Sequence, residues 1–465
     1  MLFNSFHFFL FFPIVTFFYF LFPHKFRWSW LLVASCYFYM VFKPIYILIL
    51  FFTIGIDYIA GIQIEKRKGK GKKHFLIASL IANIGVLFVF KYFNFFNNTI
   101  SSILSFFHHT NNFKSLELLL PIGLSFHTFQ AMSYTIEVYR GHQKAERHFG
   151  IYALYVMFYP QLVAGPIERP QNILHQIHEV HFPDYVKIAG GLRLMLWGFL
   201  KKMVIADHLG EYVDKMYANP GHFHGFPTLL AVLFFSIQIY CDFSGYSDIA
   251  IGAARTMGFS LMRNFNMPYF SKSIQEFWSR WHISLSSWFR DYLYIPLGGS
   301  RVAKSRLYLN LMIVFLISGL WHGANWTFVV WGALHGLFMI LSLSGKRFLP
   351  KSTTIPVFLL VTFAWIFFRA VDFNQAWLVL VNCFIGYSVI HPGLTTELVN
   401  KLNFSVCIAG ALALFLIEYL QLNYTIYKHI LNLKTIPRFG LYILLLYIIA
   451  VFGVFNNEKF IYFQF

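Results

Sequence analysis

Apolar segments recur along this chain at lengths that match the thickness of a membrane. Hydrophobic residues make up 58% of the sequence and charged residues only 12%, whereas soluble globular proteins carry about 25% charged residues. A helix that crosses a bilayer perpendicularly needs about 20 apolar residues. The pattern therefore predicts an all-α integral membrane protein with many passes. The candidate segments lie near residues 4–22, 28–42, 45–64, 75–93, 116–137, 150–165, 187–205, 226–241, 245–259, 307–321, 324–343, 353–369, 373–390, 402–422 and 437–455.

Several of these segments are shorter than a spanning helix and are interrupted by Gly or Pro. Such segments predict re-entrant or discontinuous helices, which are tolerated where protein or a water-filled cavity surrounds them. The region 261–306 contains no clean spanning run and mixes aromatic residues with Arg and Lys. Within it, residues 275–295 predict an amphipathic helix at or within the cytoplasmic interface.

Basic residues exceed acidic residues by 37 to 19. Nucleic-acid binding would explain this balance in a soluble protein. In a membrane protein, cytoplasmic loops collect Lys and Arg, so no nucleic-acid partner is expected. The densest basic cluster, 65–73, is predicted to be cytoplasmic, which places the N-terminus and segment 97–115 outside and residues 140–147 inside. The first apolar run lacks a preceding positive region, so we expect a retained helix rather than a signal peptide.

His322 differs from most of the 19 histidines because it lies between two apolar stretches and not in a loop. This position places the imidazole within the bilayer, where an ionisable residue is often functional. A pKa near neutrality suits a histidine to general base catalysis. Gly319, Gly323 and Ala324 leave room for close helix approach or for a ligand. From the spacing alone, a structural histidine that makes an interhelical hydrogen bond is an equal alternative.

His335 follows His322 on the next apolar stretch. In one continuous helix it would face away from His322, so the two are not expected to bind one metal. Neither residue has a carboxylate near it in the sequence, and there is no HExxH motif. The 4 cysteines lack CxxC spacing. No metal site is predicted.

Four segments, in order, carry a resemblance to a known family: YPQLVAGPIERP (159–170), QIYCDFSGYSDIAIGAARTMGF (238–259), FWSRWHISLSSWFRDYLYIPLGGSR (277–301) and SGLWHGANWTFVVWGALHG (318–336). Together with the terminal FIYFQF (460–465), they resemble the membrane-bound O-acyltransferase family. The most similar branch is the bacterial one that acetylates exported polysaccharides, including the alginate and peptidoglycan O-acetyltransferases. The resemblance to the membrane protein that exports D-alanine to teichoic acids is more distant. The resemblance to the acyltransferase family covers nearly the whole chain, so one multi-pass domain is expected over residues 1–465.

The resemblance implies a helical ring around a funnel, with a histidine in a central tunnel that joins the cytoplasm to the exterior. It implies that His322 is the family's essential histidine, which either takes the proton of the acceptor hydroxyl or carries the acetyl group itself. It also implies that His282, where eukaryotic relatives carry Asn, is a second active-site residue. Arg280 and Arg290 are expected to bind acetyl-CoA, the cytosolic co-substrate, although positive-inside topology explains the basic residues equally well. Asp291 is expected either to orient Arg290 or to form a structural salt bridge.

The implied function is a membrane O-acetyltransferase of the bacterial inner membrane that serves an exported or cell-wall polysaccharide. Because such a polymer cannot reach a cytosolic donor, an extracytoplasmic acetyl-accepting protein is expected as a partner. One alternative is an acyltransferase that modifies a lipid or a protein. The other is a transporter without covalent chemistry, which is disfavoured because the sequence shows no internal repeat.

Overall fold

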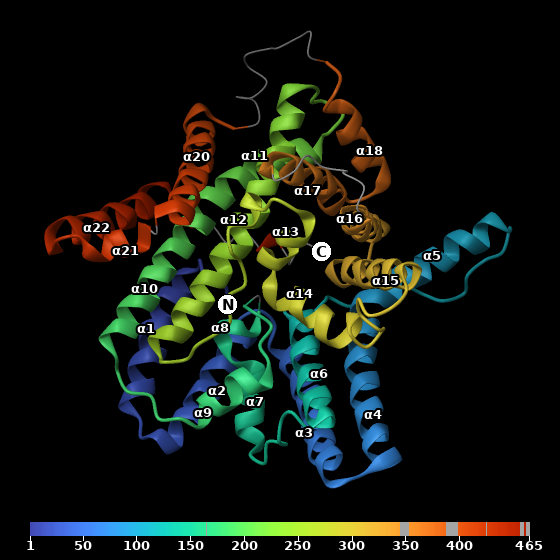
Figure 1. The fold of residues 1–465 in the computed structure, drawn as a ribbon, viewed down its shortest axis with the longest axis vertical. Coiled ribbons are helices and arrows are strands. Elements are labelled where there is room, and N and C mark those ends of the chain that lie inside the picture. The colour runs from blue at the N-terminus through green and yellow to red at the C-terminus, as the bar shows by residue number, and fades with distance from the viewer. Residues whose placement is uncertain (164, 345–352, 387–398, 425, 456–459, 462–465) are drawn as a thin grey trace. The chain divides into compact units, whose positions relative to one another are not determined.

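The computed structural model describes residues 1–465 except 164, 345–352, 387–398, 425, 456–459 and 462–465 (Figure 1). The end of the predicted segment 373–390 and most of the terminal motif lie outside the described residues. The described residues form helices and connecting segments without a β-strand, which confirms the predicted all-α class. Among these residues, 6 helices are long and apolar enough to cross a membrane. They span Pro44–Lys66, Gly69–Phe106, Phe226–Thr256, Trp326–Leu343, Lys401–Tyr424 and Thr435–Phe452.

The chain divides into two units with three boundaries between them. Two boundaries fall within the helices α10 (Tyr185–Phe199) and α12 (Phe226–Thr256), and the third lies after α12, between Arg263 and Asn264. Unit 1 comprises Met1–Arg193 and Ala250–Arg263, and unit 2 comprises Leu194–Ile249 and Asn264–Phe465. Besides its parts of α10 and α12, unit 1 contains α1 (Phe6–Leu21), α2 (His24–Met40), α3 (Ile47–Lys66), α4 (Gly69–Leu87), α5 (Phe93–Phe106), α6 (Leu124–Arg140), α7 (Phe149–Met157), α8 (Tyr159–Leu162) and α9 (Pro170–His178).

Helices α3, α4 and α6 of unit 1 are joined by a buried polar cluster. The Asp57 carboxylate of α3 accepts hydrogen bonds from Ser79 Oγ at 2.6 Å and from Asn83 Nδ2 at 2.9 Å, both on α4. Ser79 Oγ also lies 3.0 Å from Thr135 Oγ1 on α6. Since an unsatisfied polar group is costly inside a membrane protein, these bonds fix the register of the three helices.

Buried ion pairs in unit 2 join the segment that follows α10 to α12. A π-helical segment, η3 (Leu200–Ala206), follows α10. On it, Lys202 Nζ lies 2.7 Å from Asp207 Oδ1 and 2.9 Å from Asp242 Oδ1 of α12. Asp242 Oδ2 also accepts the backbone N–H of Ile461 at 2.8 Å. These paired charges offset much of the cost of burial and attach the segment after the last helix to α12.

The remaining helices of unit 2 are mostly short up to residue 294 and long after it (Figure 1). They are α11 (Asp207–Ala218), α13 (Ile274–Arg280), α14 (Ile283–Phe289), η5 (Arg290–Tyr294), α15 (Lys304–His322), α16 (Trp326–Leu343), α17 (Thr354–Arg369), α18 (Phe373–Asn382), α20 (Lys401–Tyr424), α21 (Ile426–Asn432) and α22 (Thr435–Phe452).

Two sequence-based boundaries were wrong. Segments 226–241 and 245–259 form one helix, α12, because Asp242 is paired with a lysine and Gly245 allows close contact with α10. Residues 275–295 do not form one amphipathic helix but divide into α13, α14 and η5. The predicted external segment 97–115 begins inside α5, which ends at Phe106.

Candidate active site

Helices α15 and α16 form a hairpin whose backbones meet at glycines. A side-chain carbon added to Gly319 would lie 2.3 Å from the Phe328 carbonyl oxygen, and one added to Gly332 would lie 2.3 Å from the Phe315 carbonyl oxygen. Between the helices, a carbon added to Gly323 would lie 2.1 Å from the Phe328 ring. Of the two roles expected for Gly319 and Gly323, close helix approach and room for a ligand, these contacts favour close helix approach.

His322 is the last residue of α15, and its side chain is only 3% exposed. Its Nδ1 lies 2.6 Å from the carbonyl oxygen of Ser318, one turn earlier. A carbonyl oxygen can only accept, so Nδ1 must carry the hydrogen and donate it. The neutral ring then has its basic lone pair on Nε2. This arrangement gives His322 the tautomer and orientation of a general base.

Aromatic rings form the walls around His322. The ring centroids of Trp331 and Trp321 lie 4.8 and 5.0 Å from that of His322, and the centroid of Phe368 on α17 lies at 5.5 Å. All three rings are steeply inclined to the imidazole, at 69° to 89°. Apolar surroundings of this kind strengthen electrostatic interactions at a buried group.

His282 lies between α13 and α14 and is fully buried. Its backbone is left-handed, with φ 43° and ψ 54°, a conformation in which histidine is more common than most residues. Its Nδ1 lies 3.1 Å from Asn264 Oδ1, which also accepts a hydrogen bond from Ser284 Oγ at 2.9 Å. Asn264 Nδ2 in turn donates to Ser247 Oγ of α12 at 3.1 Å. This chain of bonds makes Nδ1 the donor, so Nε2 is the basic nitrogen here too.

Trp321 joins the two histidines. Its ring centroid lies 5.0 Å from that of His322 and 6.2 Å from that of His282. The structure thus brings the two histidines proposed from the sequence against one indole ring. Asn264, Ser318 and Trp321 were not selected from the sequence, because nothing in their local pattern indicates which histidine each one contacts.

The sequence-based argument about His335 does not hold. It assumed one continuous helix, but α15 ends at His322 and α16 begins at Trp326. His335 also packs against Trp331, with ring centroids 4.9 Å apart, and its ring centroid lies 5.0 Å from that of Trp278. His335 therefore belongs to the same aromatic cluster as His322 instead of facing away from it.

Arg280 and Arg290 are both engaged by acidic neighbours. Arg280 Nη2 lies 2.7 Å from Glu276 Oε1, and Arg290 Nε lies 2.8 Å from Asp291 Oδ1. The hydrogen bond to Asp291 raises the pKa of Arg290. Asp291 therefore forms an ion pair with Arg290. The side chain of Arg290 remains 62% exposed. Either arginine can bind a phosphate only by sharing or exchanging its carboxylate.

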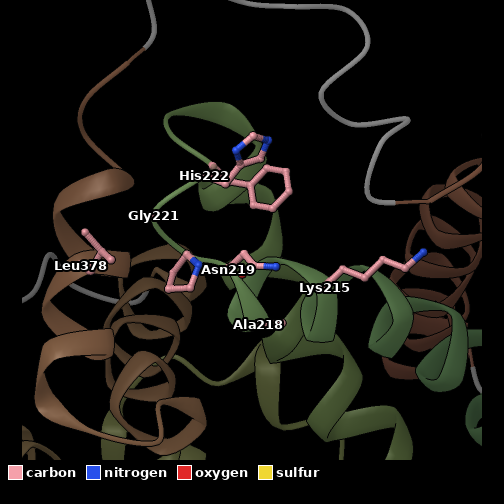
Figure 2. A pocket seen from close by; sticks show the side chains of 8 residues that line it. Lys215, Ala218, Asn219, Gly221, His222 and Leu378 are labelled. Atoms are coloured by element: carbon pink, nitrogen blue, oxygen red, sulfur yellow. The ribbon is translucent and has the colours of Figure 1, made fainter.

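Unit 2 has a surface pocket of about 710 Å³, and neither His282 nor His322 lines it. It is lined by residues at the end of α11 and in the segment after it, and by Leu378 of α18 (Figure 2). Lys215, Asn219 and His222 supply its polar side chains, and Lys215 is paired with Glu211 at 2.9 Å. Its residues do not form a proton-transfer arrangement like that at His322.

Comparisons with known proteins identify the family to which this chain is similar. The family model described as MBOAT, membrane-bound O-acyltransferase family, matches residues 148–370, which include both histidines. A probable alginate O-acetylase of Pseudomonas aeruginosa is 39% identical over 79% of this chain and 72% of its own length. The peptidoglycan O-acetyltransferase of Helicobacter pylori is 36% identical over 80% of this chain and 77% of its own length. A teichoic acid D-alanyltransferase of Streptococcus thermophilus is 30% identical over 51% of this chain and 60% of its own length.

Proposed function

Because this chain belongs to the membrane-bound O-acyltransferase family, we propose that it moves an acetyl group from cytosolic acetyl-CoA across the bacterial inner membrane for O-acetylation of an exported or cell-wall polysaccharide. Membership of this family makes the chain an O-acyltransferase and argues against the alternative of a transporter without covalent chemistry. The names of the alginate and peptidoglycan relatives support a polymer acceptor over a lipid or protein acceptor. The resemblance also supports one domain built as a helical ring around a tunnel.

The observation that carries the mechanism is the buried His322 with its hydrogen on Nδ1. Nε2 takes the proton of the acceptor hydroxyl while the oxygen attacks the thioester carbonyl carbon. The bond from carbon to sulfur then breaks, and the imidazolium returns its proton to the departing thiolate. The dry aromatic walls keep water from hydrolysing the thioester.

His282 is the second residue of the proposed site. Its Nε2 is oriented by the bond from Nδ1 to Asn264, and Trp321 contacts both His282 and His322. We assign it the positioning of the reacting acyl group or hydroxyl. Binding of acetyl-CoA is assigned to Arg280 and Arg290, which exchange their carboxylate partners for the donor. The acceptor hydroxyl belongs to an extracytoplasmic protein, which passes the acetyl group to a hydroxyl of the polymer.

The test compares His322→Ala with His109→Ala, a change at an exposed histidine after α5. The assay measures consumption of radiolabelled acetyl-CoA by purified protein and the acetyl content of the exported polymer in cells. We expect His322→Ala to lower acetyl transfer by ~10²–10⁴-fold without lowering the melting temperature, and His109→Ala to change neither quantity. A folded His322→Ala protein with normal acetylation would remove His322 from the mechanism.

A further inference from the structure

Helices α10 and α12 of unit 1 approach each other so closely that only glycine fits between them. A side-chain carbon added to Gly191 would lie 2.5 Å from the carbonyl oxygen of Gly252 and 2.7 Å from Thr256 Cγ2. The contact holds the first half of α10 against the end of α12. It also fixes the positions from which the neighbouring side chains extend.

Two arginines converge on the adjacent Gly190. A carbon added there would lie 3.9 Å from Arg193 Nη2 and 3.9 Å from Arg255 Nη1. Both guanidinium groups thus border the space left by the missing side chain. Guanidinium groups stay protonated at any physiological pH. Each has several N–H donors, and phosphate oxygens accept charge-assisted hydrogen bonds from such donors.

The surroundings of Arg255 leave this role open to an external anion. Arg255 is exposed, and no carboxylate of the described chain lies within 4.0 Å of it as an ion-pair partner. In this it differs from Arg280 and Arg290, whose carboxylate partners lie on the same or the next turn. Planar guanidinium groups match the geometry of phosphate oxygens, and pairs of them recur in phosphate recognition.

Contacts within unit 1 identify the face on which the arginines lie. Ser260, just after α12, accepts a hydrogen bond from Gln176 Nε2 of α9 at 3.0 Å. At the end of α9, His178 Nε2 lies 2.8 Å from Glu146 Oε2, within the basic segment that the sequence predicts to be cytoplasmic. The end of α12 therefore shares that face, where both nucleotide-linked donors and the headgroups of anionic lipids are present.

We propose that Arg193 and Arg255 form a phosphate-binding site over Gly190. The ligand is a phosphate ester, and two sources carry that chemistry at this face. One is the nucleotide portion of the acyl donor, and this source rests on the proposed function. The other is the phosphodiester of an anionic phospholipid, which does not depend on it.

The first experiment measures equilibrium binding to the purified full chain in detergent. The probes are adenosine 3′,5′-bisphosphate and short-chain phosphatidylglycerol, with phosphatidylcholine as the neutral lipid. We expect Arg193→Gln and Arg255→Gln each to weaken binding of one of the two anionic probes by about tenfold or more, since a charge-assisted hydrogen bond is lost. Arg67→Gln, which removes the same charge from the basic loop after α3, should leave both affinities unchanged.

Kinetics then separate the two sources. If the donor binds here, both glutamine variants raise the KM for acetyl-CoA and leave kcat unchanged. If a lipid binds here, phosphatidylglycerol affinity falls and the KM stays the same. Unchanged affinity for both anionic probes in both variants would overturn the site. Failure of the wild-type protein to use acetyl-CoA would instead overturn the proposed function, while the binding measurements would still decide the site.

A second variant tests the position of the site without removing an arginine. Gly190→Asp places a carboxylate between the two guanidinium groups, so it should prevent binding of the phosphate probe and preserve or raise the melting temperature. Gly190→Ala is the matched control, because its added carbon meets only ordinary contacts of 3.8–3.9 Å. Normal phosphate binding by a folded Gly190→Asp protein would contradict the proposal.

Discussion

Replacing Gly323 by Ala tests whether the hairpin of α15 and α16 sets the position of the proposed catalytic histidine. The Gly323 backbone is extended, with φ −156° and ψ 146°, so alanine can adopt its conformation. The new carbon would lie 2.1 Å from Phe328 Cε2, far inside van der Waals contact, and the ring must move. The centroid of Phe328 lies 4.9 Å from that of Phe368, which lies 5.5 Å from that of His322.

We expect this overpacking to cost roughly 1–3 kcal/mol in the free energy of unfolding. If the displacement reaches His322 and approaches 1 Å, it should lower acetyl transfer by up to about 10²-fold. The assays are thermal unfolding in detergent and turnover of acetyl-CoA. Gly85→Ala is the control, since no atom of another element lies within 4 Å of its added carbon.

A double mutant isolates the clash. Phe328→Ala removes the ring that Gly323→Ala would strike, so the double variant should be destabilised less than the sum of the two single variants. The expected coupling is about 1–3 kcal/mol, the cost of the removed clash. Strictly additive effects, or a Gly323→Ala protein as stable and active as Gly85→Ala, would refute the reasoning.

Three further outcomes are expected. Asn264→Ala removes the acceptor that orients His282 and should lower acetyl transfer while Asn264→Asp retains more activity, as measured by kcat at equal folded protein. His335→Ala opens a cavity in the tryptophan cluster and should lower the free energy of unfolding by roughly 2–5 kcal/mol, as measured by melting curves. Its turnover per folded molecule should fall less than that of His322→Ala. Membrane-impermeant cysteine labelling from outside should reach a probe at Thr110 and miss one at Gly69, and the reverse pattern would invert the predicted topology.

Much of the site could be found in the sequence because the signals are local. A histidine between two apolar runs, flanked by glycines, indicates a buried imidazole at a helix junction, and the motif around His322 indicates the family. His282 was found through the resemblance alone. Its partner Asn264 precedes it by 18 residues, and no local periodicity connects them.

The errors also have physical reasons. Asp242 looked like the end of an apolar segment because its partner Lys202 lies on another helix. His335 was placed by helical phase, which applies only while a helix continues, and the chain reverses direction after His322. Each error came from treating an element without the neighbour that balances its charge or ends its helix.

The sequence by itself determined that this chain is an all-α membrane protein, that it belongs to an acyltransferase family, and that two histidines are its candidate reactive residues. Composition, apolar run length and motif order are properties of the linear chain and need no neighbours. The tertiary structure alone decided the tautomer of each histidine, the tryptophan between them and the convergence of two arginines over Gly190. These features depend on distances between helices, and such distances are set by side-chain packing across the fold and not by any single segment.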